Sequence, residues 1–315
     1  MKRSLLALIC CPGCAGDLEL RDAVEETDGV KSGRLICARC AAAYPIVGFI
    51  PRFVGSDAYA GNFSFEWTVH KTTQLDSATG TGESLATFVE KTGERPDDLA
   101  GKVVLDVGCG TGRFMEVLGG GPAAVIGIDL SLAVESARDN LRGQPNMHVI
   151  QASVFNLPLR SGTFDFIYSI GVLHHTPGTR EAFRKLPPLL RPGGAVAIWV
   201  YSDETRYLHL RNRFSDAYRL VTVHLPARLL WLLSHLAIPF YHLKKIPKLG
   251  TVLDVVLPMS NHPERQWRVL DTYDWYSPKY QFKHTYPEVE QWFRDAGLGG
   301  IERLPFPVSV RGKKV

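Results

Sequence analysis

The sequence predicts an α/β fold, in which a doubly wound, mostly parallel sheet follows a small cysteine-rich module and carries a helical insertion. Three observations support this prediction. Apolar β-branched runs end at acidic residues or glycine turns and alternate with helical segments. Two Cys-x-x-Cys pairs stand near the N-terminus. Residues 203–283 separate the expected fifth strand from the closing segments, which is far longer than an ordinary connection. A chain of 315 residues suggests about two domains.

The clearest expected strand covers residues 103–107 and runs directly into a turn with glycines at 108, 110 and 112. Glycine lets the backbone turn sharply and approach a ligand closely, and the N-terminus of the following helix offers free N–H groups to an anion. A second apolar run, residues 124–128, ends at Asp129, where an acid can bind both hydroxyls of a ribose. The spacing G-x-G-x-G is tighter than the dinucleotide pattern G-x-G-x-x-G. The simpler alternative is an α/β turn without a ligand.

The stretch from Asp106 to Gly112 resembles the first motif of the class I S-adenosylmethionine-dependent methyltransferases, and Asp129 resembles their second motif. The resemblance implies a Rossmann-like sheet of seven strands, with S-adenosylmethionine as the cofactor. Where the family commonly has an Asp that binds the adenine amino group, this chain has Ser153. The cofactor-binding residues implied by the resemblance are Asp106, Gly108, Cys109, Gly110, Gly112, Arg113, Asp129, Leu130, Ser153, Val154, Ser169, Ile170 and Gly171.

Three further strands are expected in the same domain. Residues 147–152 form the third, residues 164–170 the fourth, and residues 195–201 the fifth, which follows a turn at residues 190–194. The fourth strand and its exit, and the turn before the fifth, also resemble methyltransferase motifs, so the resemblance covers residues 101–202. Ligands of doubly wound sheets bind beyond the carboxyl ends of the strands, which places the exit of the fourth strand at the site.

The N-terminal cysteines predict a zinc site. Cys11 and Cys14 form one pair and Cys37 and Cys40 the other, with a spacing typical of four thiolates around a tetrahedral Zn²⁺. This segment resembles the small zinc-ribbon family that includes the activating partner of eukaryotic tRNA and translation-factor methyltransferases. We expect the zinc to be structural and the ribbon to dock onto the catalytic domain rather than to recruit substrate.

Three further local features lie outside the expected strands of the core. An aromatic cluster around Phe63, Phe65 and Trp67 forms either a lid over the cofactor or ordinary core packing. Within the insertion, residues 225–243 indicate a buried cap helix in preference to an apolar substrate wall or a membrane-surface contact. Thr285 and Glu288 form the pattern of a capping box.

The expected division of the chain has five parts. These are a zinc ribbon (1–54), a linker with the N-terminal lid helix (55–100), the cofactor-binding core (101–202), the cap insertion (203–283), and a final helix with antiparallel strands (284–315).

Composition narrows the function only slightly. The net charge of +4 is too small to indicate a nucleic-acid partner by itself. Most of this charge comes from the segment 203–268, where basic residues outnumber acidic ones. Solvated helix faces are the simpler explanation of these basic residues. The apolar region 220–243 is interrupted by Pro226 and Pro239 and makes a poor membrane span, and the N-terminus does not read as a signal peptide. We expect a cytoplasmic protein with no transmembrane segment, and the sequence leaves the oligomeric state open.

Methyl transfer from a sulfonium is an in-line displacement that often needs one base. The candidate catalytic residues are His174, His175 and His284, since histidine titrates in the useful range. The enclosing insertion favours an enzyme that methylates a small or lipid-like molecule at O, N or C. The alternative is a tRNA or rRNA methyltransferase that uses the zinc ribbon and the basic insertion for RNA. A second alternative is a non-catalytic cofactor-binding partner protein, which the missing acid at Ser153 would favour.

Overall fold

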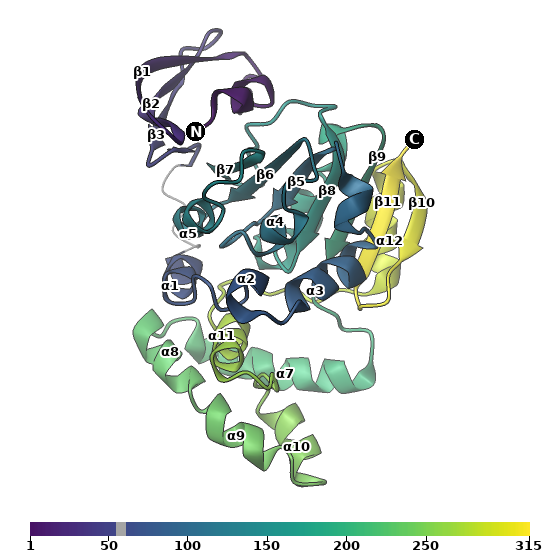
Figure 1. Cartoon of the computed structure of the whole chain (residues 1–315). Coiled ribbons are helices and arrows are strands. Elements are labelled where there is room, and N and C mark those ends of the chain that lie inside the picture. The colour runs from purple at the N-terminus through teal and green to yellow at the C-terminus, as the bar shows by residue number, and fades with distance from the viewer. Residues whose placement is uncertain (55–60) are drawn as a thin grey trace.

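The computed structural model describes residues 1–54 and 61–315. Part of the expected linker, residues 55–60, lies outside the described residues. A small antiparallel sheet stands at one end of the molecule, a large sheet covered by helices lies in the middle, and a group of helices forms the opposite end (Figure 1). Among the described residues, no helix is long and apolar enough to cross a membrane.

The N-terminal module is a four-stranded antiparallel sheet in the order β1-β2-β3-β4. Each Cys-x-x-Cys pair forms a tight turn, because the Ala15 amide donates to the carbonyl of Cys11 and the Ala41 amide donates to the carbonyl of Cys37. The two turns therefore present their sulfurs toward each other. The strands are β1 Leu18–Glu26, β2 Gly29–Cys37, β3 Ala43–Val47 and β4 Ile50–Pro51.

The large sheet has seven strands in the order β10-β11-β9-β8-β5-β6-β7, and it confirms the predicted fold class. The strands β9, β8, β5, β6 and β7 are parallel, whereas β10 and β11 are antiparallel to their neighbours. The chain leaves β5 first toward β6 and later returns to β8 on its other side, so the carboxyl end of β5 is the switch point where such sheets bind ligands. The strands are β5 Val103–Val107, β6 Ala124–Asp129, β7 Met147–Gln151, β8 Phe164–Ile170, β9 Leu190–Trp199, β10 Leu298–Arg303 and β11 Ser309–Lys314.

Helices cover both faces of this sheet, and the helices α7 to α11, which follow β9, form the cap (Figure 1). Short 3-10 helices cover Arg3–Ala7, Pro96–Leu99, Leu173–His175 and Pro187–Leu189. The α-helices are α1 Gly61–Val69, α2 Asp76–Thr79, α3 Glu83–Thr92, α4 Arg113–Leu118, α5 Ala133–Asn140, α6 Thr179–Phe183, α7 Arg206–Thr222, α8 Ala227–Ser234, α9 Ala237–Leu243, α10 Leu249–Val256, α11 Arg265–Tyr276 and α12 Tyr286–Asp295.

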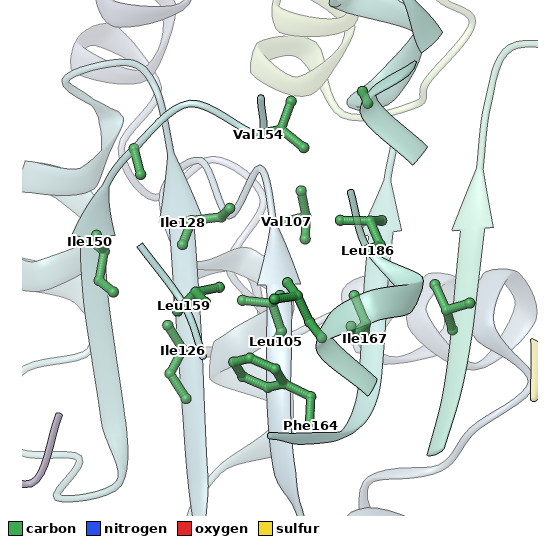
Figure 2. Packing of buried hydrophobic residues seen from close by; sticks show 14 of the residues in the cluster. Leu105, Val107, Ile126, Ile128, Ile150, Val154, Leu159, Phe164, Ile167 and Leu186 are labelled. Carbon is green, nitrogen blue, oxygen red and sulfur yellow. The ribbon is translucent and has the colours of Figure 1, made fainter. Parts of the chain in front are cut away.

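The strands are apolar on both faces because helices bury both. Alternate residues point to opposite sides, so Leu105 joins one core cluster and Val104 the other. Figure 2 shows the first cluster, in which Leu105 and Ile126 lie beside Phe164. Each fully buried aliphatic side chain contributes about 1.5–3 kcal/mol relative to exposure, so the central strands are firmly held.

The N-terminal module shares this core. Met1, Leu5 and Ile9 belong to the same buried cluster as Leu159 of the large domain. Backbone hydrogen bonds join the two parts: the Cys10 amide to the Pro158 carbonyl (3.1 Å), the Arg160 amide to the Leu8 carbonyl (3.1 Å) and the Phe53 amide to the Gln151 carbonyl (2.8 Å). The module is therefore docked along the β7 edge of the large sheet.

Two local predictions are wrong. Residues 225–243 form two helices, α8 and α9, rather than one buried helix, and Leu229 and Leu232 of α8 and Leu236 between the helices are exposed. The helix α12 begins after Thr285, but the Thr285 side chain caps nothing and Glu288 instead pairs with His284. In both cases the local sequence pattern was a poor guide. Contacts with distant parts of the fold determine which side chains are buried and which hydrogen bonds form.

Candidate active site

A cavity of about 790 Å³ opens at the carboxyl ends of β5, β6 and β8. One wall is the glycine turn between β5 and α4 together with the end of β6. The other walls come from α1, α3, α7 and α11, so the cap and α1 enclose the switch point of the sheet. In the part of the chain that the structure describes, no residue of the N-terminal module lines this cavity.

The glycine turn is fixed to β6. The amides of Gly108 and Cys109 both donate to the carbonyl of Ile128, at 2.7 and 2.9 Å. Gly108 has φ +85°, and a Cβ there would lie 2.4 Å from the Val172 side chain, so only glycine fits. On the cavity side, the ring of Trp67 in α1 lies 3.6 Å from the Cβ position of Gly110. The Trp67 side chain of α1 therefore covers the turn.

Asp129 stands beside this turn with a fixed carboxylate. Its Oδ2 accepts from the Gly110 amide at 3.0 Å, and its Oδ1 accepts from the amide and the hydroxyl of Ser131 at 2.8 and 2.7 Å. Burial raises the pKa of Asp129, and these hydrogen bonds oppose the rise. Both oxygens retain lone pairs, so the group can accept hydrogen bonds from a ribose.

The residues expected to bind cofactor divide into two groups. Nine line the cavity: Gly108, Cys109, Gly110, Arg113, Asp129, Leu130, Val154, Ile170 and Gly171. The other four support its wall: Ser169 donates to the Val107 carbonyl (2.9 Å), Ser153 accepts from the Phe155 amide (3.3 Å), and Gly112 packs on Leu141, while Asp106 lies buried behind the turn.

Asp106 is an unusual supporting residue. Burial raises its pKa to about 8, and the neighbouring Tyr168 hydroxyl lowers it in part. One of its carboxylate oxygens, Oδ2, has no hydrogen-bond partner within the described chain. An unpaired buried oxygen behind a ligand-binding turn is costly, and it is the kind of group that a bound polar ligand or water satisfies.

The three candidate catalytic histidines have different surroundings, and only His175 lines the large cavity. Its Nδ1 lies 2.9 Å from the carbonyl oxygen of Tyr280, so Nδ1 carries the proton. Its Nε2 is buried and has no partner among the described residues, which leaves a free lone pair. Burial lowers the pKa of His175, so the ring is neutral near pH 7 and can accept a proton.

His174 and His284 lie outside the cavity wall. His174 is completely buried, with its ring centroid 4.1 Å from that of His175, and its Nδ1 accepts from the Tyr201 amide at 3.3 Å. His284 uses both ring nitrogens, Nδ1 with Glu288 (2.9 Å) and Nε2 with Thr179 (3.0 Å). It lines a separate cavity of about 480 Å³ between α6 and α12.

Three carboxyl groups near His175 were not foreseen. Glu66 of α1 is fully buried with both carboxylate oxygens unpaired within the described chain, and burial raises its pKa well above the usual range. Burial also raises the pKa of Asp271 to about 6. Asp274 accepts from the Tyr201 hydroxyl at 3.1 Å. The spacing of Asp271 and Asp274 on one helical face was a usable signal, but nothing in the sequence marks Glu66.

Basic side chains enter the same cavity. The Lys91 ammonium lies 3.2 Å from the centre of the Trp199 ring, and burial lowers its pKa to about 7. Arg113 donates to the Ser84 hydroxyl at 2.8 Å, and Arg211 of α7 stacks over Trp275. The cavity is thus lined by a histidine with a free ring nitrogen and by both acidic and basic side chains. Such a lining suits a polar ligand.

The four cysteines of the N-terminal module converge as predicted. Their sulfurs all lie within 4.8 Å of one another, with 3.6 Å between Cys11 and Cys40 and 3.4 Å between Cys14 and Cys37. Four sulfurs about 2.3 Å from a tetrahedral Zn²⁺ stand about 3.8 Å apart, so the group fits zinc. Arg39 beside Cys14 lowers the pKa of that thiol to about 6, which favours the thiolate that binds metal.

Comparisons with known proteins match both parts of the chain. The family described as "Methyltransferase domain" matches residues 105–198, and the family described as "Trm112p-like protein" matches residues 2–48. The chain is 34% identical over 128 residues to the tRNA U34 carboxymethyltransferase of Methylococcus capsulatus, covering 36% of this chain and 40% of that protein. It is 36% identical over 115 residues to the probable tRNA methyltransferase 9B of Mus musculus, covering 35% and 24%. The chain therefore spans less than half the length of these relatives.

Among solved structures, the chain is similar to the complex between the Haloferax volcanii Trm112 methyltransferase activator and the methyltransferase solved with it. That match has 13% sequence identity and a TM-score of 0.45, and it covers 80% of this chain and 97% of that chain.

The expectation of a small or lipid-like substrate is wrong, because the curated relatives are named for modification of tRNA. The enclosing cap misled the prediction for a physical reason. A nucleoside turned out of an RNA strand enters a pocket as concave as one for a free small molecule, so enclosure does not distinguish the two.

The methyltransferase domain implies S-adenosylmethionine as cofactor, and the four-cysteine group of the Trm112p-like domain implies structural zinc. The chain joins an N-terminal Trm112p-like zinc ribbon to a class I S-adenosylmethionine-dependent methyltransferase domain.

Proposed function

We propose that this protein is a tRNA methyltransferase, which transfers a methyl group from S-adenosylmethionine to a nucleoside turned out of the RNA into the cavity. The observation that carries the proposal is the position of His175, which lines the same cavity as the glycine turn and whose buried Nε2 has no hydrogen-bond partner within the described chain. The substrate class, tRNA, comes from the names of the relatives. Because two of these names specify U34, a uridine at position 34 is the first nucleoside to examine.

The proposed division of the chain is the one expected from the sequence: a ribbon, 1–54; a lid segment, 55–100; the cofactor-binding core, 101–202; a cap, 203–283; and the closing elements, 284–315. In this arrangement Asp129 would bind the ribose, and Leu130 and Val154 would hold the adenine. Gly108 and Gly171, which line the same cavity as His175, would hold the methionine end. Asp106 and Ser169 hold the turn from behind.

The chain's own residues position the nucleophile and handle its proton. When bound, S-adenosylmethionine supplies an electrophilic methyl group on a sulfonium. The free Nε2 of His175 accepts the proton of the attacking atom, while the Tyr280 carbonyl holds the ring in the correct tautomer. Trp67 and the cap exclude water from the reacting atoms. Tyr201, held by Asp274, forms the wall beside His175.

We favour methyl over carboxymethyl as the transferred group. Glu66, Asp271 and Asp274 line the same cavity as His175, and each carries a carboxyl group. A carboxylate on the donor would add a further negative charge to this buried group of acids, which is unfavourable in a low-dielectric site. A sulfonium carrying a plain methyl group adds a positive charge instead.

The helix α7 is the proposed contact for RNA phosphates. Its residue Arg211 lines the cavity, and Arg206 and Arg213 are exposed with no ion pair to any described residue. Arginine is well suited to phosphate, and phosphate contacts position an RNA without reading its sequence. The ribbon is proposed to stabilise the core, since its docking surface is the β7 edge. We also place the protein in the cytoplasm, where tRNA is available and zinc-binding thiols remain reduced.

The test is transfer of radiolabel from S-adenosylmethionine into a host-cell extract from which the protein has been removed. The products are then separated into tRNA, rRNA, protein and organic-soluble fractions. The proposal predicts label in tRNA, recovered as one nucleoside after digestion. Label only in another fraction would overturn the tRNA assignment, and absence of transfer from any extract would favour a protein that binds cofactor without catalysis.

A further inference from the structure

The cap exposes a large apolar surface that the proposed function leaves unexplained. We define the outer face of the cap as the exposed side chains of Leu220, Leu229, Leu232, Leu236, Ile246 and Leu249. Leu220 is 77% exposed and Leu232 is 61% exposed. Single exposed leucines are ordinary, but so many exposed large apolar side chains within residues 220–249 are more than monomeric proteins usually present to water.

This face has no partner within the described chain, whereas the inner face of the same helices does. Leu230 packs against Tyr273 and Tyr276 of α11, and the Trp231 indole donates to His70 at 3.3 Å. The helices are therefore anchored with their outer leucines pointing away from the fold. Figure 1 shows α8, α9 and α10 at the end of the molecule opposite the zinc ribbon. Residues 213–258 contribute nothing to the wall of the large cavity.

The charged residues of the segment 217–253 are all basic. From Ala217 to Leu253 the sequence contains no Asp and no Glu. The same stretch contains five basic residues, of which Arg228, Lys245 and Lys248 are exposed. A patch that is apolar, basic and free of acids is typical of helices that lie in the plane of a membrane surface.

Other occupants fit less well. RNA would gain from the basic residues but nothing from the leucines, because phosphate contacts are electrostatic. A second copy of this chain would cover the leucines, but it would bring basic residues against basic residues with no acid on the face to pair them. An anionic bilayer surface satisfies both features at once, because the leucines enter the acyl boundary and the basic residues meet lipid phosphates.

We propose that the outer face of the cap docks this protein on the surface of an anionic membrane, with Leu232 and Leu236 inserted and Arg228, Lys245 and Lys248 against the headgroups. Docking is peripheral, and no described helix could span the bilayer. The proposal rests on residues outside the cavity, so it stands or falls separately from the tRNA activity.

The experiment is sedimentation of the full-length protein with vesicles of phosphatidylcholine, with and without phosphatidylglycerol. We expect binding that requires phosphatidylglycerol and weakens as salt is raised. The double variant Leu232→Ser, Leu236→Ser should lower the partition coefficient more than tenfold. Lys245→Glu should lower it more than about fivefold, since one basic residue near an anionic surface contributes about that factor. Matched controls are Val24→Ser and Lys313→Glu, which change exposed residues on β1 and β11.

Three outcomes would overturn the proposal. The first is equal sedimentation with and without anionic vesicles. The second is a dimer in light scattering that the double leucine variant converts to a monomer, which would identify the face as a self-association surface. The third is loss of tRNA binding in Lys245→Glu with vesicle binding intact, which would identify an RNA surface. Methyl transfer measured in parallel reports on the tRNA activity, so failure of one proposal is distinguishable from failure of the other.

Discussion

The Nδ1 atom of His175 lies 2.9 Å from the carbonyl oxygen of Tyr280, and this contact decides which ring nitrogen carries the proton. A carbonyl can only accept, so the proton stays on Nδ1 and the lone pair of Nε2 is left free. Burial lowers the pKa of this histidine and keeps it neutral, as a general base requires.

Replacing the proposed base should slow the chemical step. His175→Asn is expected to lower kcat about 10²–10⁴-fold and to leave the Kd for S-adenosylmethionine nearly unchanged, because His175 is proposed to act on the nucleophile and not to hold the cofactor. The rate of the wild type should rise with pH through a pKa below about 6.5 and then level off, since only the neutral ring accepts a proton. His209→Asn, which changes an exposed histidine paired with Asp203, is the matched control. A wild-type rate in His175→Asn would exclude this residue as the base.

The glycine turn should not tolerate a side chain at its tightest point. Gly108→Ala places a methyl group 2.4 Å from the Val172 side chain at φ +85°, and we expect the Kd for S-adenosylmethionine, measured by calorimetry, to rise at least about tenfold. Gly162→Ala has the same kind of backbone strain at φ +65° with nothing within 4 Å of the added carbon. If both variants weaken binding equally, general destabilisation rather than the turn explains the effect.

The buried Asp106 makes the stability depend on pH. Burial raises its folded-state pKa to about 8, above the unfolded value of about 3.9. Its contribution is therefore fully present below about pH 4 and is lost as the pH rises toward about 8. Asp106→Asn carries no charge, so without cofactor it should be more stable than the wild type by about 1–3 kcal/mol at pH 8 and about equal to it at pH 4. A difference in Tm that stays constant across this range would contradict the assignment.

Zinc removal should destabilise the whole chain, since the ribbon shares a core with the large domain. Without the metal, Met1, Leu5 and Ile9 lose the frame that buries them, and each fully buried side chain is worth about 1.5–3 kcal/mol. Cys37→Ser should abolish zinc binding in metal analysis and lower Tm by several degrees. Cys10→Ala, which changes a buried cysteine outside the group of four, should keep its zinc. Full zinc content in Cys37→Ser would show that the metal is held elsewhere.

The arginines of α7 should set the salt dependence of tRNA binding. Replacing Arg206 and Arg213 with alanine is expected to weaken binding and to reduce the slope of log K against log salt by about one for each residue. Arg228→Ala removes an exposed arginine from the outer face of the cap instead and should leave tRNA binding unchanged. An unchanged slope in the α7 variant would place the RNA on another surface.

The parts of the fold that could be predicted are those with local signals. The run ending at Val107 and the glycines after it mark a strand and a turn, and the cysteine spacing marks a metal site, because neighbouring residues alone decide these features. Glu66 and Asp274 meet only because α1 packs against α11, which no local pattern records. The exposed leucines of α8 were misjudged for a similar reason, since hydrophobicity gives no information on which face finds a partner.

The most direct test of the central claim is mass spectrometry of tRNA nucleosides from host cells with and without the gene for this protein. We expect one nucleoside to lack a methyl group in the deletion strain. The wild-type gene should restore that group, whereas His175→Asn should not. Identical tRNA nucleosides in the two strains would contradict the proposed tRNA methylation.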